Sequence, residues 1–429
     1  MMTFTRKLKS TTLILGLAML GFSCSDSDNN SESATISGKV ENGNQKVAAA
    51  DGTVVSAARI TSNGSIQTID GTEADTEASG RFDVAVNADA YQNIVVQAKS
   101  EAETNMGYVA AKVENGSSYT IKPINAESSA ETKVFAELVA SGNAKMVNKS
   151  EIEAVVTSNS AAAINANASE SSRIAAALSN SARVRAEYFE SEFEGESEAK
   201  MEAVTNAMID AQTQLEAQLN NSNSVEARQE AYATFRASFT NAYLNAEMEA
   251  STAAKIVEMW GRVFINSTSS ASAEVKSEMN TQVSILTATI IDTAVKAEME
   301  AAGTEQSSRD AVVQAGVTLK SEINASAGVM SEIRAAFETY HDEVRTALEN
   351  DSNFSASAIV TVDSEINSNS GAKSSFDSSI AATISADLVM NIYNSFYSSI
   401  ESTVESNISG SEAELEAVTE LMILINTAS

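Results

Sequence analysis

The chain contains a single proline, and its position divides the sequence into two parts of different character. After Pro123, residues 124–429 contain no proline and few glycines, and apolar residues recur at intervals of three and four. One such stripe is formed by Val275, Met279, Val283, Leu286 and Ile290. Proline is the residue least compatible with a helix interior, and this spacing places apolar side chains on one helix face. The second part is therefore predicted to be helical.

Clusters of Ser, Asn and Gly interrupt the helical pattern and mark the predicted helix ends. They occur at NNSNS, NSTSSAS, GTEQSS, ENDSN, NSNSG and SGSE. Between the first two clusters an uninterrupted apolar stripe runs from Val225 to Phe264, which predicts one helix about 60 Å long. A stripe rich in alanine buries little area alone, so the helices must pack against each other. Residues 130–429 are predicted to form an elongated, mostly antiparallel helical bundle, with ETKVFAELVASG as a first short helix.

Before Pro123 the sequence consists of short segments typical of β-strands. TISGKVE, TVVSAARI, SIQTI, RFDVAVN, NIVVQAK, GYVAAKV and SYTIK are separated by turn clusters such as NGN, SNG and ENGSS. In RFDVAV, the residues Phe82, Val84 and Val86 alternate with polar residues, which predicts one buried and one exposed face. Seven short strands at this spacing predict a small β-sandwich over residues 34–125. The predicted fold class is α+β multidomain, with the sandwich followed by the helical bundle.

These strand segments resemble the carboxypeptidase regulatory-like, or transthyretin-like, domain. ISGKV is similar to the first strand of that family, VVSAARI to the second, and TEASGRFDVAV to a turn and strand with the pattern Thr-x-x-x-Gly-x-Phe. The resemblance implies an accessory β-sandwich without catalytic residues. An acidic insertion precedes the turn, and its Asp70, Glu73 and Asp75 are interpreted either as an exposed acidic loop or as ligands that gather a calcium ion.

The N-terminal residues have the parts of a secretory signal peptide. The basic segment RKLK precedes the apolar stretch LILGLAMLGF, which is too short to span a bilayer as a helix. The stretch LGFSC then resembles the lipobox of bacterial lipoproteins. This resemblance implies that residues 1–23 are a signal peptide and that Cys24 is the first residue of the mature chain and carries the lipid. The alternative is an ordinary signal peptide that is cut near an unmodified cysteine.

Acyl chains on Cys24 would hold the protein at a membrane, since each buried methylene contributes about 0.8 kcal/mol. Residues 24–33 are polar and acidic and contain no large apolar side chain, so they are predicted to form a disordered tether. The predicted location is the cell envelope, with the protein anchored to the outer membrane through its lipid. Whether it faces the periplasm or the cell surface stays open.

The charge of the chain limits its partners. It contains 28 basic and 58 acidic residues, which give a formal net charge of -30. Such a chain repels phosphate backbones, so nucleic-acid binding is not expected. The predicted partners are the membrane, through the N-terminal lipid, and envelope or surface proteins or glycan. The sequence leaves the oligomeric state open.

Carboxylates are plentiful in the chain, so their number leaves a glycosidase-like pair open, but such pairs are usually held in a deep cleft, of which long alanine-rich helices offer little. The single cysteine is assigned to the lipid, and His341 is the only histidine, so zinc sites and Cys–His pairs are not expected. Glu338 and His341 have the Glu-x-x-His spacing that di-iron bundles use twice, but the spacing occurs here once. The alternative is that His341 pairs locally with Glu338 or Arg345 beside the apolar stripe. No catalytic residue, cofactor or metal is predicted.

Two classes of function fit these features. The first is a non-catalytic lipoprotein with a structural, adhesive or protein-interaction role. The second is a ligand-binding surface lipoprotein that captures glycan or another nutrient. The aromatic residues distinguish the two classes: Trp260 and the rings of AYATFRASFTNAY and NIYNSFYSS form a sugar-stacking platform if they are exposed, and part of the core if they are buried.

Overall fold

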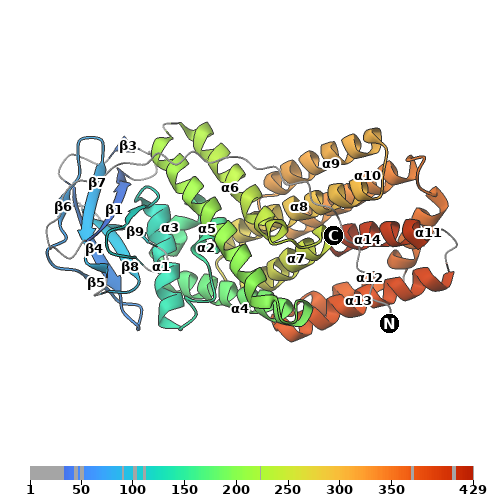
Figure 1. Ribbon diagram of the computed structural model, residues 1–429, viewed down its shortest axis with the longest axis horizontal. Coiled ribbons are helices and arrows are strands. Elements are labelled where there is room, and N and C mark those ends of the chain that lie inside the picture. The colour runs from blue at the N-terminus through green and yellow to red at the C-terminus, as the bar shows by residue number, and fades with distance from the viewer. Residues whose placement is uncertain are drawn as a thin grey trace.

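The computed structural model describes residues 33–42, 47–48, 53–88, 91–99, 104–109, 113–222, 224–368, 372–407 and 412–428. The molecule is elongated, with β-strands at one end and helices along the rest of its length (Figure 1). This α+β architecture confirms the predicted fold class, a small β-sandwich followed by a helical bundle. The signal peptide, Cys24 and all of the tether except Ser33 lie outside the described residues.

Short strands arranged in two main sheets and a two-stranded ribbon form the N-terminal region. The strands are β1 (Ala34–Lys39), β2 (Glu41–Asn42), β3 (Val47–Ala48), β4 (Val54–Ile60), β5 (Ile66–Thr68), β6 (Ala74–Asp75), β7 (Arg81–Val86), β8 (Ile94–Lys99), β9 (Thr104–Tyr108) and β10 (Ser118–Thr120). One sheet has the order β10-β1-β7, and the other has the order β5-β4-β8-β9, with β6 paired to β4. β1 lies parallel to β10 and antiparallel to β7, and β2 pairs with β3 in the ribbon.

The core of the sandwich is formed by alternate residues of these strands. In β7 the side chains of Phe82, Val84 and Val86 are buried while Arg81 and Asp83 are exposed, as the alternation predicts. The apolar side chains of the facing sheets meet in one cluster, which includes Ile36, Val55, Phe82, Val84, Val96 and Ile121. Burial of one face of each strand stabilises the sandwich by the transfer of apolar area out of water.

One predicted strand is displaced along the chain. The sequence pattern indicates a strand at GYVAAKV, whereas β9 ends at Tyr108 and begins at Thr104. The reason is the antiparallel register with β8, which pairs Lys99 with Thr104 and so places the start of β9 at Thr104. Residues 110–112 of the predicted strand lie outside the described residues.

The helical region runs from residue 126 to the end of the described chain. Its helices are α1 (Ala126–Ala140), α2 (Lys149–Val155), α3 (Ser158–Ala166), α4 (Ala168–Glu192), α5 (Ser197–Asn221), α6 (Val225–Asn245), α7 (Ala250–Ser267), α8 (Ala273–Ala301), α9 (Gln306–Ala325), α10 (Met330–Glu349), α11 (Ala356–Asn367), α12 (Ala372–Ile380), α13 (Ala386–Asn407) and α14 (Glu412–Ala428). The clusters NNSNS, NSTSSAS, GTEQSS and ENDSN each include the end of one helix or the start of the next, which confirms these predicted helix ends.

The single helix predicted from Val225 to Phe264 is wrong, because the chain turns between α6 and α7. Glu247 adopts the left-handed conformation, with φ of 57°. Lys200 on α5 donates its Nζ to the carbonyls of Ala246 at 2.9 Å and Glu247 at 3.1 Å, which satisfies acceptors that the end of α6 leaves free. After the turn, α7 packs against α4 and α8, whereas α6 packs against α5.

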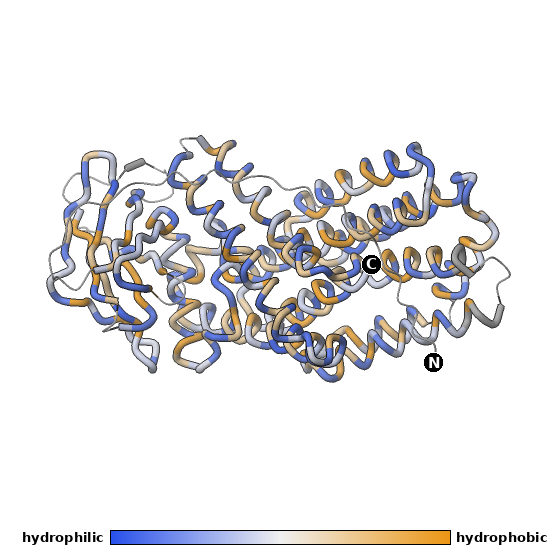
Figure 2. The backbone as a smooth tube through the Cα atoms, in the orientation of Figure 1, coloured by the Kyte–Doolittle hydropathy of each residue, from blue (hydrophilic) through white to orange (hydrophobic). Residues whose placement is uncertain are grey.

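Successive helices pack side by side along the molecule. α5 contacts α6, α7 contacts α8, and α9 contacts both α8 and α10, while α14 returns to pack against α7, α8, α10 and α11. Hydrophobic and hydrophilic residues alternate along the helices (Figure 2). Among the described helices, none combines the length with the apolar composition that crossing a membrane requires.

The sheet that contains β4, β8 and β9 is buried on both faces. Val55 and Ala57 of β4 point into the sandwich core. Ala58 and Ile60 of the same strand instead join the core of the helical region. On β9, the ring of Tyr108 stacks on Phe135 of α1 with the ring centroids 5.3 Å apart. This sheet therefore lies between the sandwich core and the first helix.

Candidate functional site

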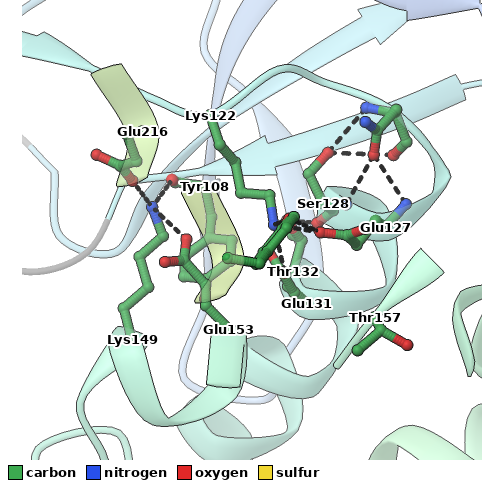
Figure 3. A network of polar contacts seen from close by, with 12 residues as sticks. Tyr108, Lys122, Glu127, Ser128, Glu131, Thr132, Lys149, Glu153, Thr157 and Glu216 are labelled. Atoms are coloured by element: carbon green, nitrogen blue, oxygen red, sulfur yellow. Dashed lines mark hydrogen bonds and ion pairs between the residues drawn. The ribbon is translucent and has the colours of Figure 1, made fainter. Parts of the chain in front are cut away.

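A network of buried polar and charged side chains lies at the junction where the strands meet the helices, and we call it the junction network (Figure 3). Lys122 follows β10, and its Nζ donates to Oε1 of Glu127 at 2.7 Å and to Oε1 of Glu131 at 2.6 Å, both on α1. Lys122 also donates to the hydroxyl of Tyr232 on α6 at 3.2 Å, and that hydroxyl donates to Glu127. The side chains of Lys122 and Glu131 are 3% and 0% exposed, so water does not screen their attraction.

The start of α1 sets the positions of these carboxylates. Asn125 is the N-cap, and its Oδ1 accepts from the backbone N–H of Glu127 at 2.9 Å. Glu127 and Glu131 are four residues apart, so both side chains lie on the helix face that meets Lys122. The Nδ2 of Asn125 donates to Glu41 at 3.1 Å, and Glu41 accepts from Arg228 of α6 at 2.9 Å. One cap thus links strand β2 to helices α1 and α6.

A second buried lysine, Lys149, connects the end of β9 to the helices. Lys149 is the first residue of α2, and its Nζ donates to the carbonyl of Tyr108 at 3.0 Å and to Oε1 of Glu216 at 2.5 Å. Oε1 of Glu153 lies 3.5 Å from the same nitrogen. The ammonium also lies 4.4 Å from the centre of the Tyr108 ring, a cation–π contact. Lys149 therefore ties α2 and α5 to the end of β9.

The numbers of lysines and glutamates in the network explain why some of its carboxylates are protonated. Two lysines face four glutamates, so two carboxylates are in excess. Burial and the neighbouring carboxylates raise the pKa of Glu131 to about 8, and burial with Glu216 raises that of Glu153 to about 7. Burial acts in the same direction on Glu127, but the charge and hydrogen bond of Lys122 outweigh it and lower the pKa of Glu127. Protonation of Glu131 and Glu153 leaves two cations opposite two carboxylates.

The aromatic residues singled out in the sequence belong to the core. Trp260 is 1% exposed, and its Nε1 donates to Oε1 of Glu151 at 3.0 Å. Arg185 donates to the same oxygen at 2.6 Å. Other rings of the two aromatic segments are buried as well: Phe235, Phe239, Tyr243, Tyr393 and Phe396. These rings cannot form an exposed stacking platform.

His341 takes part in a polar contact between two helices. Its Nε2 lies 2.9 Å from Oδ1 of Asp363 on α11, and Arg345 donates to Oδ2 of the same carboxylate at 3.1 Å. Burial raises the pKa of Asp363, but the hydrogen bond to His341 and the charge of Arg345 outweigh it and lower that pKa. Glu338 is exposed. The prediction that His341 pairs with Glu338 or Arg345 is therefore wrong, because His341 and Arg345 both contact Asp363.

The acidic insertion lies at the surface of the β-strand region. Asp70, Glu73 and Asp75 are all exposed. Within the described residues, no three or more His, Cys, Asp or Glu side chains are grouped in a way that could hold a metal ion. Thr72 stabilises the loop, since its hydroxyl donates to the carbonyl of Ile69 at 2.7 Å and accepts from the N–H of Ala57 at 3.0 Å. The interpretation as an exposed acidic loop fits these positions.

Sequence reasoning missed the junction network, although one signal for it was present. Lys149 and Glu153 are four residues apart, as are Glu127 and Glu131. The same spacing is common on solvated helix faces, so it does not indicate burial. These side chains are buried because the sheet packs against α1. This contact joins residues that are distant in the sequence, so no local pattern predicts it. Cys24, the predicted lipid site, lies outside the described residues.

Comparison with known proteins returned no relative: no protein-family model matches the chain, no curated protein matches it, and no solved structure matches it.

Proposed function

We propose that the protein is a lipid-anchored component of the cell envelope, held at the outer membrane, with a non-catalytic structural, adhesive or protein-interaction role. The stretch LGFSC supports the anchor, and the buried network around Lys122 and Lys149 is the observation that carries the structural role. Carboxylates with strongly shifted pKa values often mark active sites. Here Glu131 is 0% exposed and joins α1 to Lys122, which follows β10, while Glu153 is also 0% exposed and contacts Lys149 of its own helix. A rigid junction is what a scaffold or adhesive module requires.

The apolar contacts at the junction support the same proposal. Tyr108 and Phe135 stack across it, and both side chains are buried. A hinge at this point would expose the rings and separate Lys122 from its carboxylates, and removing one partner of a buried ion pair costs about 3–5 kcal/mol. We therefore expect the strand region and the helices to move as one body.

The proposed anchor places the strand region next to the membrane. Cys24 carries the lipid, and residues 24–33 connect it to β1, which begins at Ala34. Ten residues span at most about 35 Å when fully extended. The helical end of the molecule lies opposite the strands (Figure 1). It would thus be held away from the membrane, where it can meet a partner.

We also propose that the strand region is a carboxypeptidase regulatory-like domain. The motif residues take structural positions that support this assignment. Thr76 is buried, and its N–H donates to the carbonyl of Thr53 at 3.0 Å. Gly80 forms the turn with φ of 76°, a conformation that favours glycine, and Phe82 enters the sandwich core. All three residues serve the fold, in agreement with an accessory role.

Metabolic labelling with a clickable fatty acid, followed by separation of the membrane fraction, tests the anchor. The wild type should carry the label and remain with the outer membrane. Cys24→Ala should lose the label and move to the soluble fraction, whereas Ser25→Ala should behave as the wild type because it leaves the cysteine in place. Equal labelling of Cys24→Ala and the wild type would refute the anchor.

The interaction role is tested by cross-linking the anchored protein in intact cells. The proposal expects one envelope protein or glycan to be captured repeatedly, and expects a chain lacking the helical region to lose it. Retention of that partner by the strand region alone would contradict the assignment of the interaction to the helices.

A further inference from the structure

A groove of about 830 Å³ is lined by residues of five helices, α7, α8, α10, α11 and α12. Its charged lining is contributed by different helices: Arg262 of α7, Lys276 of α8, Arg334 and Glu338 of α10, and Lys373 and Asp377 of α12. Ile265, Met330 and Ile380 supply an apolar part of the wall. The cations are far apart in the sequence, so the fold alone brings them together.

The groove has the opposite charge to the rest of the chain. Four cationic and two anionic side chains line it, an excess of two positive charges. The whole chain has 28 basic and 58 acidic residues. A random surface of this protein would therefore be acidic. A concave surface that concentrates positive charge attracts anions, because its walls focus the field.

The cations in the groove are only partly compensated by carboxylates. Lys373 pairs with Asp377 at 2.6 Å. Within the described residues, no carboxylate lies within ion-pair distance of Arg334 or Lys276. Burial lowers the pKa of Lys373, Asp377 raises it, and the positive charges of Arg262 and Arg334 lower it further, so the pKa is lowered overall. A bound anion would relieve this repulsion.

The groove is held in shape by contacts behind it. Arg262 donates to the carbonyl of Thr427 on α14 at 3.1 Å. Asn266, one turn further along α7, donates to the carbonyls of Ile380 at 3.0 Å and Thr383 at 2.9 Å. These bonds fix α12 and α14 against α7 before any ligand arrives. Preorganised donors lose less entropy on binding than flexible ones.

We propose that this groove binds a small dianion whose charges are carboxylate, sulfate or phosphate groups. Two negative charges match the excess of two positive charges that line the groove. The planar fork of Arg334 suits an oxyanion that accepts two parallel hydrogen bonds, and Arg262 adds a second positive charge. The apolar wall of Ile265, Met330 and Ile380 leaves room for the carbon skeleton of an organic acid.

Calorimetric titration of the full mature chain tests the proposal. The probes are tartrate, sulfate and phosphate, with acetate as a monoanion, all at equal ionic strength. We expect at least one dianion to bind at least tenfold more tightly than acetate, and added sodium chloride to weaken it, since salt screens exposed charges. Preference for tartrate would identify the ligand class as a dicarboxylate. Preference for sulfate or phosphate would identify it as a sulfate ester or a phosphate ester.

Substitutions locate the site within the groove. Arg334→Gln and Lys276→Gln each remove a cation that has no ion-pair partner in the described chain, so the fold should be retained; thermal unfolding checks this. Each should weaken the preferred dianion about tenfold, which equals about 1.4 kcal/mol. Lys145→Gln removes one exposed charge between α1 and α2 and should change nothing.

Three results would overturn the proposal. They are binding of acetate as tight as that of every dianion, equal affinity of the groove variants and Lys145→Gln, and no heat from any of the three dianions with the wild type. The first and third results need no variant, so they stand even if a substitution disturbs folding.

Discussion

Replacement of Glu131 by glutamine should stabilise the protein at alkaline pH. Glu131 is fully buried, and its pKa is raised from 4.5 to about 8, chiefly by burial and against the attraction of Lys122. The folded protein therefore binds a proton on Glu131 that the unfolded chain has lost. Between these two pKa values the folded state binds more protons than the unfolded state, so the free energy of unfolding falls as the pH rises. Glutamine has nearly the same shape and cannot ionise.

The size of the effect follows from the shift in pKa. One unit corresponds to about 1.36 kcal/mol, so the shift of Glu131 amounts to about 5 kcal/mol when it is complete. At pH 6 Glu131 is protonated in the folded protein, and at pH 9 it is charged. The wild type should lose about 3 kcal/mol from this group between those pH values. The variant Glu131→Gln should lose none of it.

Urea unfolding at pH 6 and pH 9, followed by circular dichroism and by the fluorescence of Trp260, measures the effect. At pH 6 Glu131→Gln and the wild type should agree within about 1 kcal/mol, since both side chains are neutral. At pH 9 the variant should be more stable by about 3 kcal/mol. Glu153, Glu258 and Glu420 also have raised pKa values. The difference between variant and wild type is therefore the quantity to compare.

Glu127→Gln is the matched control, because it lies one turn earlier on α1 and contacts the same lysine. The pKa of Glu127 is lowered, so its carboxylate is charged in the folded protein at both pH values. Its removal should destabilise the protein at pH 6 and at pH 9, on the order of 3 kcal/mol. A loss of stability in Glu131→Gln at pH 9 as large as in Glu127→Gln would refute the reasoning, since it would mean that Glu131 is charged in the native network.

Two further substitutions test the helix packing. Gly316→Ala on α9 would place a Cβ in steric overlap with the carboxylate of Asp292 on α8. We therefore expect the free energy of unfolding in urea to fall by about 1–3 kcal/mol. Wild-type stability of this variant would show that α8 and α9 are further apart. Lys200→Met removes the donor to the carbonyls of Ala246 and Glu247. It should lower the free energy of unfolding by about 1 kcal/mol, whereas no change would show that water replaces this cap.

Local patterns in the sequence predicted much of the fold. The alternation of Phe82, Val84 and Val86 indicated the buried face of β7, and the stripe from Val275 to Ile290 is buried in α8. The turn between α6 and α7 could not be read from this pattern. It contains neither proline nor glycine, and a lysine from α5 and the packing of different partner helices decide it. Such contacts are long-range and leave no periodic signal.

The sites show the same division between local and long-range information. His341 stood out because it is the only histidine, yet its partner Asp363 lies on another helix. The groove draws its cations from four helices, so no segment of the sequence contains the cluster. The junction network combines spacings that are ordinary on helix surfaces. Composition predicts which charges exist, whereas packing decides which of them become buried or meet.

The pairing of β1 with β10 has a consequence for mechanical load. The two strands are parallel, with Thr35 opposite Ser118 and Ser37 opposite Thr120, and the ladder continues with the N–H of Ile124 donating to Lys39 at 2.7 Å. The proposed membrane anchor would pull β1 toward its start, while a partner held by the helices would pull β10 toward its end. Tension then shears the two strands along their length. All hydrogen bonds of the ladder share the force at once, whereas an antiparallel pair pulled in this way would open one bond at a time.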